Sequence, residues 1–209
     1  MKTLETLGEV SGAVPRPIFI LASASPRRLE LLRQVGLEPD RVVAGAIDET
    51  PLPKELPDAH ASRLAREKLA VIQAETDRAV VLAADTVVAC GRRILPKAES
   101  EQDARHCLAL LSGRRHRVIT AVAVRTPDGR VLERVVVTRV LVRRLSRADQ
   151  EAYIASGEWR GKAGGYAIQG RAQGFIPWIN GSYSNVVGLP LAETVALLAS
   201  LGVVAGVAP

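Results

Sequence analysis

Apolar runs and stretches of helical spacing alternate along the chain, which predicts strands and helices in turn. Residues 17–22 and 79–90 are nearly continuous apolar runs, as expected for strands buried on both faces. Residues 58–75 instead repeat apolar side chains at near-helical spacing, which indicates one buried helix face. The predicted strands are residues 17–22, 41–46, 79–90, 117–125, 130–142, 166–169 and 175–179, and the predicted helices are residues 25–36, 58–75, 100–113, 146–156 and 190–201.

The middle of the chain predicts a hairpin. Two β-branched runs, residues 117–125 and 130–142, are separated by the turn sequence Thr126-Pro127-Asp128-Gly129. Strands that alternate with helices, together with one long hairpin, predict an α/β fold with a mixed sheet. With 209 residues and no internal repeats, we expect one folded unit.

Composition and charge are those of a globular protein, and they argue against nucleic acid as a partner. Hydrophobic residues make up 47% of the chain and charged residues 24%. The net charge of +6 favours an anionic partner, but the basic residues come in scattered doublets and only 3% of the residues are aromatic. We therefore expect no nucleic-acid surface.

The chain has the features expected of a cytoplasmic protein. No apolar run approaches the ~18 residues that cross a bilayer, and residues 1–14 lack the pattern of a signal peptide, so no membrane partner is expected. Cys90 and Cys107, the two cysteines, have no metal-ligand or redox spacing and are predicted to be reduced.

The predicted strand-to-helix junction around residues 21–28 combines three devices that bind anions. It offers free backbone N–H groups at a helix start, the hydroxyls of Ser23 and Ser25, and the guanidiniums of Arg27 and Arg28. A phosphate cradle is one interpretation, and a well-capped helix with two solvated arginines is the other.

Two charged residues stand where the pattern expects apolar ones. Asp85 lies inside the run 79–90, where a carboxylate is costly to bury unless a cation or hydrogen-bond donors compensate it. Lys68 lies four residues after Leu64, on the apolar face of a predicted helix, where it needs an anionic partner or must extend to solvent. Asp85 is thus a candidate catalytic carboxylate, and backbone N–H groups or an arginine are the alternative partners for it.

Two other motifs do not support a site. Residues 157–162 resemble a phosphate-binding loop but are one residue short, and Ala163 stands where Ser or Thr would hold magnesium. His60, His106 and His116 lack ligand spacing, so the sequence indicates neither a zinc site nor a catalytic triad.

Taken together, these residues resemble the Maf family of nucleoside triphosphate pyrophosphatases. The resemblance runs from about Ile18 to Leu201, and several motifs occur in the family's order. They are Leu21-Ala22-Ser23-Ala24-Ser25-Pro26-Arg27-Arg28, Asp48-Glu49-Thr50, Leu64-Ala65-Arg66-Glu67-Lys68, Ala84-Asp85-Thr86-Val87-Val88, Leu111-Ser112-Gly113-Arg114, the stretch from Lys162 to Gly170, and Val187-Gly188-Leu189-Pro190-Leu191.

The resemblance implies a mixed, twisted sheet flanked by helices, with two lobes around a nucleotide cleft. Residues 17–209 would form this single domain, and residues 1–16 would be a flexible extension. The implied activity is hydrolysis of a nucleoside triphosphate to the monophosphate and pyrophosphate, with Mg²⁺ or Mn²⁺ as the cofactor and a homodimer as the assembly.

The resemblance also implies roles for individual residues. Asp85 would be the catalytic carboxylate and would share the metal with Glu49, while Ser23, Arg28, Lys68 and Lys97 would bind the phosphates. Arg27, Thr86 and Gln169 match the subgroup that acts on dTTP and UTP and would select the base. Where the family commonly has Gly-Lys-Pro, this chain has Pro96-Lys97-Ala98, which makes the position of Lys97 less secure.

Two alternatives remain at this point. One is a nucleotide-binding regulator of cell division without turnover, although a carboxylate next to a triphosphate would then bring no benefit. The other is a pyrophosphatase of modified purine nucleotides such as 7-methyl-GTP.

Overall fold

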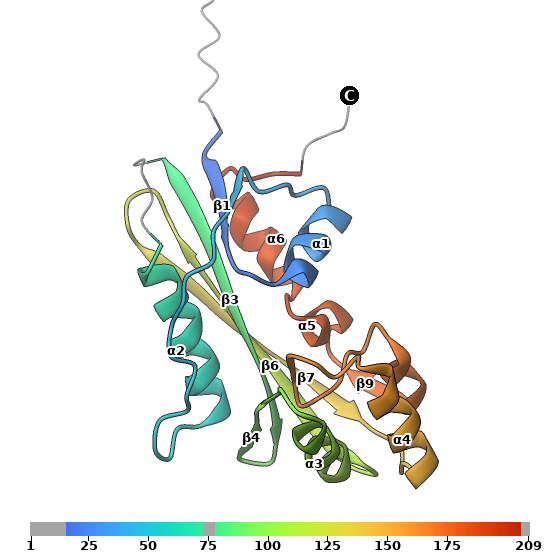
Figure 1. Cartoon of the computed structure of the whole chain (residues 1–209). Helices are drawn as coiled ribbons and strands as arrows, with labels where there is room; N and C mark the ends of the chain where they lie inside the picture. The colour runs from blue at the N-terminus through green and yellow to red at the C-terminus, as the bar shows by residue number, and fades with distance from the viewer. Residues whose placement is uncertain (1–15, 73–77, 206–209) are drawn as a thin grey trace, which may run out of the picture.

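A large twisted sheet runs through the protein, and both of its faces are covered by helices (Figure 1). The computed structural model describes residues 16–72 and 78–205, so the predicted extension lies almost wholly outside the described residues. The strands are β1 (Ile18–Ala22), β2 (Arg41–Val42), β3 (Ala79–Cys90), β4 (Arg93–Leu95), β5 (Lys97–Ala98), β6 (Arg115–Arg125), β7 (Val131–Leu141), β8 (Lys162–Ala163) and β9 (Trp178–Asn180). Within the described part of the chain, no helix is long and apolar enough to cross a membrane.

The main sheet is mixed, as the sequence predicted. Its order is β2-β1-β3-β6-β7-β9, with β4 paired to β3. Strands β2, β1 and β3 are parallel, whereas β3, β6, β7 and β9 pair antiparallel. The predicted hairpin is confirmed as β6 and β7, which pair from Arg115↔Leu141 to Arg125↔Val131. β5 and β8 form a separate two-stranded sheet.

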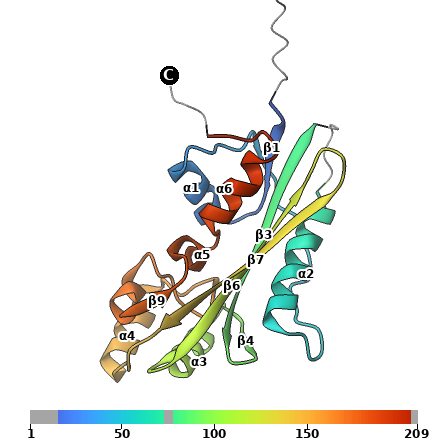
Figure 2. The same ribbon diagram turned by 180° about the vertical axis from the view of Figure 1, so that it is seen from behind.

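The helices divide the core between two lobes. They are α1 (Pro26–Gln34), α2 (Pro57–Ala70), α3 (Glu101–Leu111), α4 (Arg147–Ser156), α5 (Tyr183–Val187) and α6 (Leu191–Ala199), with a short 3₁₀ helix at Arg171–Phe175. In the upper lobe, α2 packs on one face of β1, β3 and β6, and α1 and α6 pack on the opposite face (Figures 1 and 2). In the lower lobe, α3 and α4 pack around the buried Trp159 and Tyr153.

Three predicted strands differ from the structure. Of these, residues 175–179 overlap β9 only at Trp178 and Ile179, because Phe175 still belongs to the 3₁₀ helix. Residues 41–46 pair only at Arg41–Val42, because β2 is an edge strand with both residues exposed and little apolar surface to keep the chain on the sheet. The prediction of a strand at residues 166–169 is wrong. That stretch follows Gly164 and Gly165, which both have a positive φ of 66°, so the chain turns there instead of extending. β8 lies just before it, and the short elements β4, β5 and α5 were not predicted.

A buried carboxylate secures the loop between β2 and α2. Glu55, whose side chain is only 8% exposed, accepts hydrogen bonds from Arg63 Nε at 2.7 Å and Arg63 Nη2 at 2.9 Å. His60 Nδ1 lies 2.8 Å from the same carboxylate. Arg63 also donates to the backbone carbonyl of Thr50 at 3.1 Å. Because Thr50 directly follows Glu49, this clamp fixes the part of the loop that carries Glu49.

We predict that Glu55→Gln destabilises the protein by about 1 to 3 kcal/mol at pH 7, measured by urea unfolding. Hydrogen bonds from Arg63 lower the pKa of Glu55 from 4.5 to about 2, against the opposing effect of burial. A lowered folded-state pKa stabilises the protein above about pH 4.5, and this contribution is lost as the pH falls toward about 2. The difference in free energy of unfolding between wild type and variant should therefore become smaller below pH 4.5.

Glu38→Gln is the matched control, because Glu38 also pairs with an arginine but its side chain is 60% exposed. Because the solvent screens this exposed pair, its effect should be much smaller than that of Glu55→Gln at any pH. A loss of unfolding free energy in Glu55→Gln that does not depend on pH would contradict a stabilising role of the ionised Glu55 carboxylate.

Candidate active site

The alternation of side chains along β3 sends two neighbouring polar residues to opposite faces of the sheet. The apolar neighbours show the alternation: Val81 and Ala83 pack in the α2 cluster, whereas Leu82 packs against α1 and α6. Asp85 lies an even number of residues from Val81 and Ala83 and so points to their face of the sheet. Thr86 points to the same face as Leu82. Asp85 therefore meets a residue of α2, and Thr86 meets a residue of α1.

The partner of Asp85 is Lys68. Lys68 Nζ donates to Asp85 Oδ1 at 2.5 Å and lies 2.8 Å from Glu49 Oε1. The structure thus confirms that a cation compensates the buried Asp85 and that Lys68 has an anionic partner. Among the described residues, the second oxygen of Asp85 has no hydrogen-bond partner, so it is left to face the cleft.

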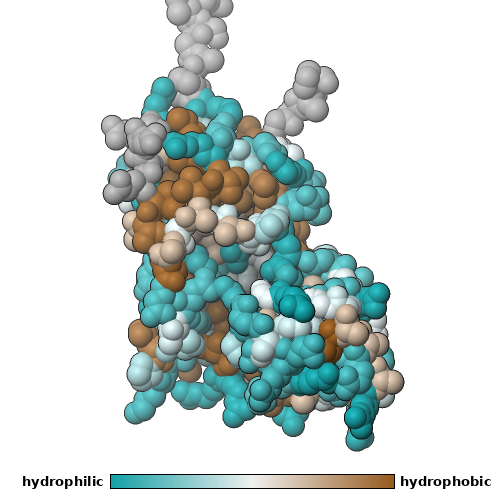
Figure 3. All heavy atoms as spheres, viewed as in Figure 1, coloured by the Kyte–Doolittle hydropathy of each residue, from teal (hydrophilic) through white to brown (hydrophobic). Residues whose placement is uncertain are grey.

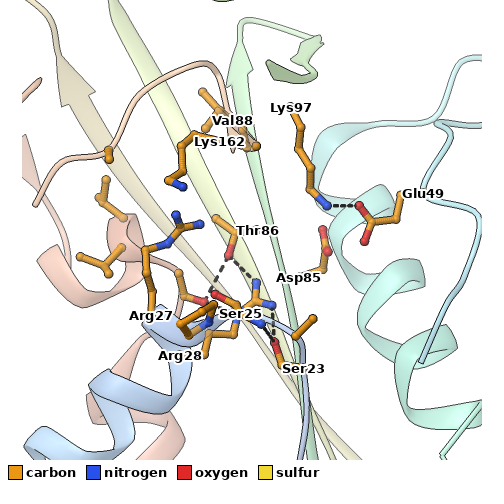
Figure 4. Close-up of a pocket in the computed structure, with 18 of the residues that line it drawn as sticks. Ser23, Ser25, Arg27, Arg28, Glu49, Asp85, Thr86, Val88, Lys97 and Lys162 are labelled. Carbon is orange, nitrogen blue, oxygen red and sulfur yellow. Dashed lines mark hydrogen bonds and ion pairs between the residues drawn. The ribbon is translucent and has the colours of Figure 1, made fainter. Parts of the chain in front are cut away.

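Glu49 joins a second lysine to this group. Lys97 donates to Glu49 Oε2 (Figure 4), and because Lys68 contacts the other oxygen, Glu49 is held between Lys68 and Lys97. Burial opposes ionisation, but the hydrogen bonds from the two lysines lower the pKa of Glu49 to about 2. Glu49 is therefore a carboxylate at neutral pH, and the order Lys97, Glu49, Lys68, Asp85 alternates in charge.

Arg28 occupies the opposite side of the sheet and is largely engaged within the protein. Its Nε donates to the carbonyl of Gly188 at 2.8 Å, and its Nη1 and Nη2 donate to Ser23 Oγ at 3.2 Å and Thr86 Oγ1 at 3.1 Å. Burial lowers the pKa of Arg28, and the charge of Asp85 partly opposes this. In the described chain no carboxylate pairs with Arg28, so its positive charge is available to an anion in the cleft.

The hydroxyls of Ser23 and Thr86 differ in whether they can still donate a hydrogen bond to a ligand. The Ser23 hydroxyl accepts hydrogen bonds from the backbone N–H of Ser25 and from Arg28, which leaves its own O–H to donate. The Thr86 hydroxyl contacts Arg28, Thr120 Oγ1 at 3.0 Å and the carbonyl of Gly188 at 3.3 Å, so it is fully used within the protein. Thr86 thus fixes Arg28 rather than offering a free group.

Arg27 and Lys162 reach into the cleft from opposite sides (Figure 4). Burial lowers the pKa of both side chains, and the nearby charge of Arg27 lowers that of Lys162 further. Within the described residues, the Arg27 guanidinium has no hydrogen-bond or ion-pair partner. Two like charges held together in this way create a site for an anion.

Lys162 was not singled out from the sequence. It closes the stretch 157–162 that resembles an incomplete phosphate-binding loop, but here it lies in β8 and its Nζ donates to the carbonyl of Arg160. The signal in that stretch was a lysine among glycines, and the backbone arrangement around it is not that of a phosphate-binding loop.

The start of α1 offers further donors. Ser25 occupies the N-cap position and Pro26 opens the helix, as predicted, but no side chain caps the first turn. Pro26 has no N–H, and the N–H groups of Ser25 and Arg28 already donate to Ser23 Oγ and to the Ser25 carbonyl. The Arg27 N–H, which has no partner in the described chain, lies at the cleft and adds the partial positive charge of the helix N-terminus to the two arginines. This geometry favours the phosphate cradle over the well-capped helix with solvated arginines.

One cavity of about 380 Å³, part of which Figure 4 shows in close-up, is lined by every residue that the sequence analysis selected. Figure 3 shows hydrophilic residues on either side of the hollow between the two lobes and an apolar band above it. Gln169 is exposed at the rim of this cavity, from which it reaches neither Asp85 nor Lys68 by any hydrogen bond in the described chain. The selected residues are Ser23, Arg27, Arg28, Glu49, Lys68, Asp85, Thr86, Lys97 and Gln169.

The replacement Pro96-Lys97-Ala98 does not displace the lysine. Lys97 lies in β5 opposite Ala163, and the Pro96 carbonyl accepts a hydrogen bond from Gly164 N at 3.0 Å. A side chain at Gly164 would collide with Val88, since an added Cβ would lie 2.7 Å from Val88 Cγ1. Close packing of this glycine against β3 thus holds the segment after β8, and with it β5 and Lys97, next to the main sheet.

The cysteines and histidines play no part in this cavity. Cys90 and Cys107 are free thiols, as predicted. His116 is buried against the Tyr166 hydroxyl at 2.8 Å, and burial lowers its pKa to about 4. No three His, Cys, Asp or Glu side chains of the described residues gather into a metal site.

Comparison with known proteins agrees with this picture. The model of the family described as Maf-like protein matches residues 18–201. A dTTP/UTP pyrophosphatase of Caulobacter vibrioides is 61% identical over 186 residues, covering 89% of this chain and 96% of that protein. A dTTP/UTP pyrophosphatase of Novosphingobium aromaticivorans is 58% identical over 195 residues, covering 93% and 97%.

Solved structures show only a distant likeness. A nucleoside-triphosphatase (dITP/XTP pyrophosphatase) from Mycobacterium abscessus is 19% identical, with a TM-score of 0.39 over 61% of this chain and 74% of that chain. Because the family model and both sequence relatives span most of the chain, the protein belongs to the Maf-like protein family.

Proposed function

We propose that the protein is a nucleoside triphosphate pyrophosphatase that hydrolyses dTTP and UTP to the monophosphate and pyrophosphate. One observation carries the proposal: a single buried carboxylate, Asp85, lies in a cleft whose other charged groups are mostly cations. A strongly anionic substrate explains the cations, and a hydrolytic reaction explains the carboxylate. Sequence relatives that cover most of the chain are named dTTP/UTP pyrophosphatases.

Asp85 is the proposed catalytic base. Lys68 holds one of its oxygens, so the carboxylate cannot rotate freely, and the other oxygen accepts a proton from the attacking water. Cleavage between the α and β phosphates then releases pyrophosphate. Lys68 is placed to stabilise the charge that develops, because it lies beside the reacting group.

The remaining cations bind the phosphates in this proposal. Ser23 donates its hydroxyl, the start of α1 donates the free N–H of Arg27, and Lys97 supplies a half-exposed ammonium. Arg28 contributes charge while it holds Ser23 and Thr86 in place. Lys162 is the residue that the structure adds to the phosphate-binding set.

Base selection is proposed for Arg27 and Gln169. Neither side chain has a partner among the described residues, so both are free to contact a base. The Gln169 amide offers a donor and an acceptor to a pyrimidine edge. Thr86 acts indirectly, because its hydroxyl positions Arg28.

The donor set fits a magnesium or manganese ion held only in part by the protein. Asp85 and Glu49 both contact Lys68, and two carboxylates completed by substrate phosphate oxygens are a usual arrangement for Mg²⁺. Such an ion supplies charge neutralisation for the phosphates and lowers the pKa of a bound water. Glu49 and Asp85 are the residues that would hold it.

A cytoplasmic homodimer is part of the same proposal. Val131, Val135 and Val137 on one face of β7 are exposed, and a dimer contact would bury apolar surface of this kind.

The reaction is tested by incubating the purified protein with dTTP, UTP, 7-methyl-GTP, ATP, GTP and CTP, with and without Mg²⁺ or Mn²⁺. Ion-exchange chromatography of the products should give monophosphate and pyrophosphate from dTTP and UTP. Preferred turnover of 7-methyl-GTP would support the pyrophosphatase reaction but would contradict the proposed selection of pyrimidine bases by Arg27 and Gln169. If no triphosphate is cleaved with any metal, the proposed activity is wrong and the alternative of a nucleotide-binding regulator without turnover takes its place.

We predict that Asp85→Asn lowers kcat for dTTP by about 100-fold or more, since a general base contributes roughly 10²- to 10⁴-fold. Asp58→Asn is the control, because Asp58 is an exposed aspartate at the start of α2, outside the cleft. Binding of a non-hydrolysable dTTP analogue, measured by calorimetry, should survive in Asp85→Asn. Turnover within a factor of a few of wild type would remove Asp85 from the chemistry.

We predict that EDTA abolishes turnover and that Glu49→Gln weakens Mn²⁺ binding about tenfold or more, as expected when a ligand is removed. The measurement is Mn²⁺ titration by electron paramagnetic resonance in the presence of the dTTP analogue. Glu101→Gln, an exposed carboxylate on α3, should leave the affinity unchanged. An unchanged Mn²⁺ affinity in Glu49→Gln would show that the metal binds elsewhere.

A further inference from the structure

A second cavity of about 370 Å³ adjoins the active-site cleft. It lies between α1 and α5, and its volume falls within the ~300 to 1,000 Å³ of small-molecule sites. Four residues line both cavities, so the two spaces meet along a shared wall. These residues are Pro26, Arg27, Gln169 and Val187.

The walls of the second cavity combine apolar surface with a few polar groups. Leu31 of α1 and Val187 of α5 are apolar, and Glu30 and Gln34 of α1 add polar atoms at the edge. Tyr183, at the start of α5, supplies the aromatic ring, and this residue is 41% exposed. Its hydroxyl has no hydrogen-bond partner in the described chain, so the hydroxyl is free to contact a ligand or water.

The two cavities follow one another along the cleft, with Arg27 between them. Asp85, Glu49 and Lys97 lie on one side of the cleft, and Arg27 rises from the start of α1 on the other side (Figure 4). The second cavity begins at Arg27 and Gln169. A ligand with its phosphates among the lysines would therefore extend its other end past Arg27 toward Tyr183.

We propose that the second cavity is the nucleobase subsite and that the Tyr183 ring stacks on the pyrimidine, a proposal that rests on the function given above. Stacking suits an exposed ring next to apolar walls, because a pyrimidine presents a π-face of similar width. Leu31 and Val187 provide an apolar surface for a pyrimidine edge that carries a methyl group. Tyr183 thereby becomes a specificity-determining residue alongside Arg27 and Gln169.

The test measures what the base contributes to binding. Calorimetry compares dTMP with deoxyribose 5-phosphate, which has the same phosphate and sugar but no base, and steady-state assays give kcat and KM for dTTP. For Tyr183→Ala, we expect the Kd of dTMP and the KM of dTTP to rise about tenfold to hundredfold, as loss of one stacked ring implies. The Kd of deoxyribose 5-phosphate should stay unchanged, and kcat should change little.

Three further variants sharpen the result. Tyr183→Phe keeps the ring and should bind dTMP like the wild type, whereas Tyr183→Leu keeps apolar bulk without the ring and should behave like Tyr183→Ala. Trp178→Ala is the matched control, since Trp178 is an aromatic residue of similar exposure, 38%, that lines neither cavity. It should leave all constants unchanged.

Two results would overturn the proposal. If Tyr183→Ala loses affinity equally for dTMP and deoxyribose 5-phosphate, Tyr183 supports the site without contacting the base. If the Kd of neither ligand changes, the base binds elsewhere. Because dTMP binding requires no turnover, these outcomes differ from failure of the proposed function, which would appear as wild-type protein that does not cleave dTTP.

Discussion

The ion pair between Lys68 and Asp85 is the interaction on which the rest of the site depends. A carboxylate buried in the middle of a strand loses several kcal/mol of hydration, so its position is tenable only if a cation reaches it. Lys68 reaches it because α2 packs across β3 with Lys68 on its inner face. Glu49 then joins the same lysine, and the clamp of Glu55 and Arg63 fixes the loop that carries Glu49. One ion pair thus ties the sheet, the helix and the loop to a single geometry.

The site holds more positive charge than the protein itself balances. Glu49 and Asp85 compensate Lys68 and Lys97, but Arg27, Arg28 and Lys162 have no carboxylate partner among the described residues. The desolvation of these cations lowers their pKa values, which is a cost to the folded state in the absence of a ligand. An anionic ligand relieves this cost, so the same groups that weaken the fold locally provide the affinity for phosphates.

The two cavities divide recognition along the length of the cleft. Charged and hydrogen-bonding groups line the part next to Asp85, whereas apolar walls and Tyr183 line the part beyond Arg27. The first part is suited to binding charged groups, and the second part is suited to binding an apolar group that fits its shape. Arg27 stands between the two parts and lines both cavities.

The sequence by itself determined the mixed α/β fold, the long hairpin, and the set of residues that share the cleft. It did so because Asp85 and Lys68 break strong apolar patterns, and because motif order carries information that single motifs lack. It did not determine the short strands β4, β5 and β8 or the turn at residues 166–169, whose conformations follow from glycine and from packing between the lobes. Only the tertiary structure decided that Arg28 and Thr86 bind each other, that Lys162 faces Arg27, and that Tyr183 lines a second cavity. These facts depend on contacts between residues far apart in the chain, and local periodicity carries no information about such contacts.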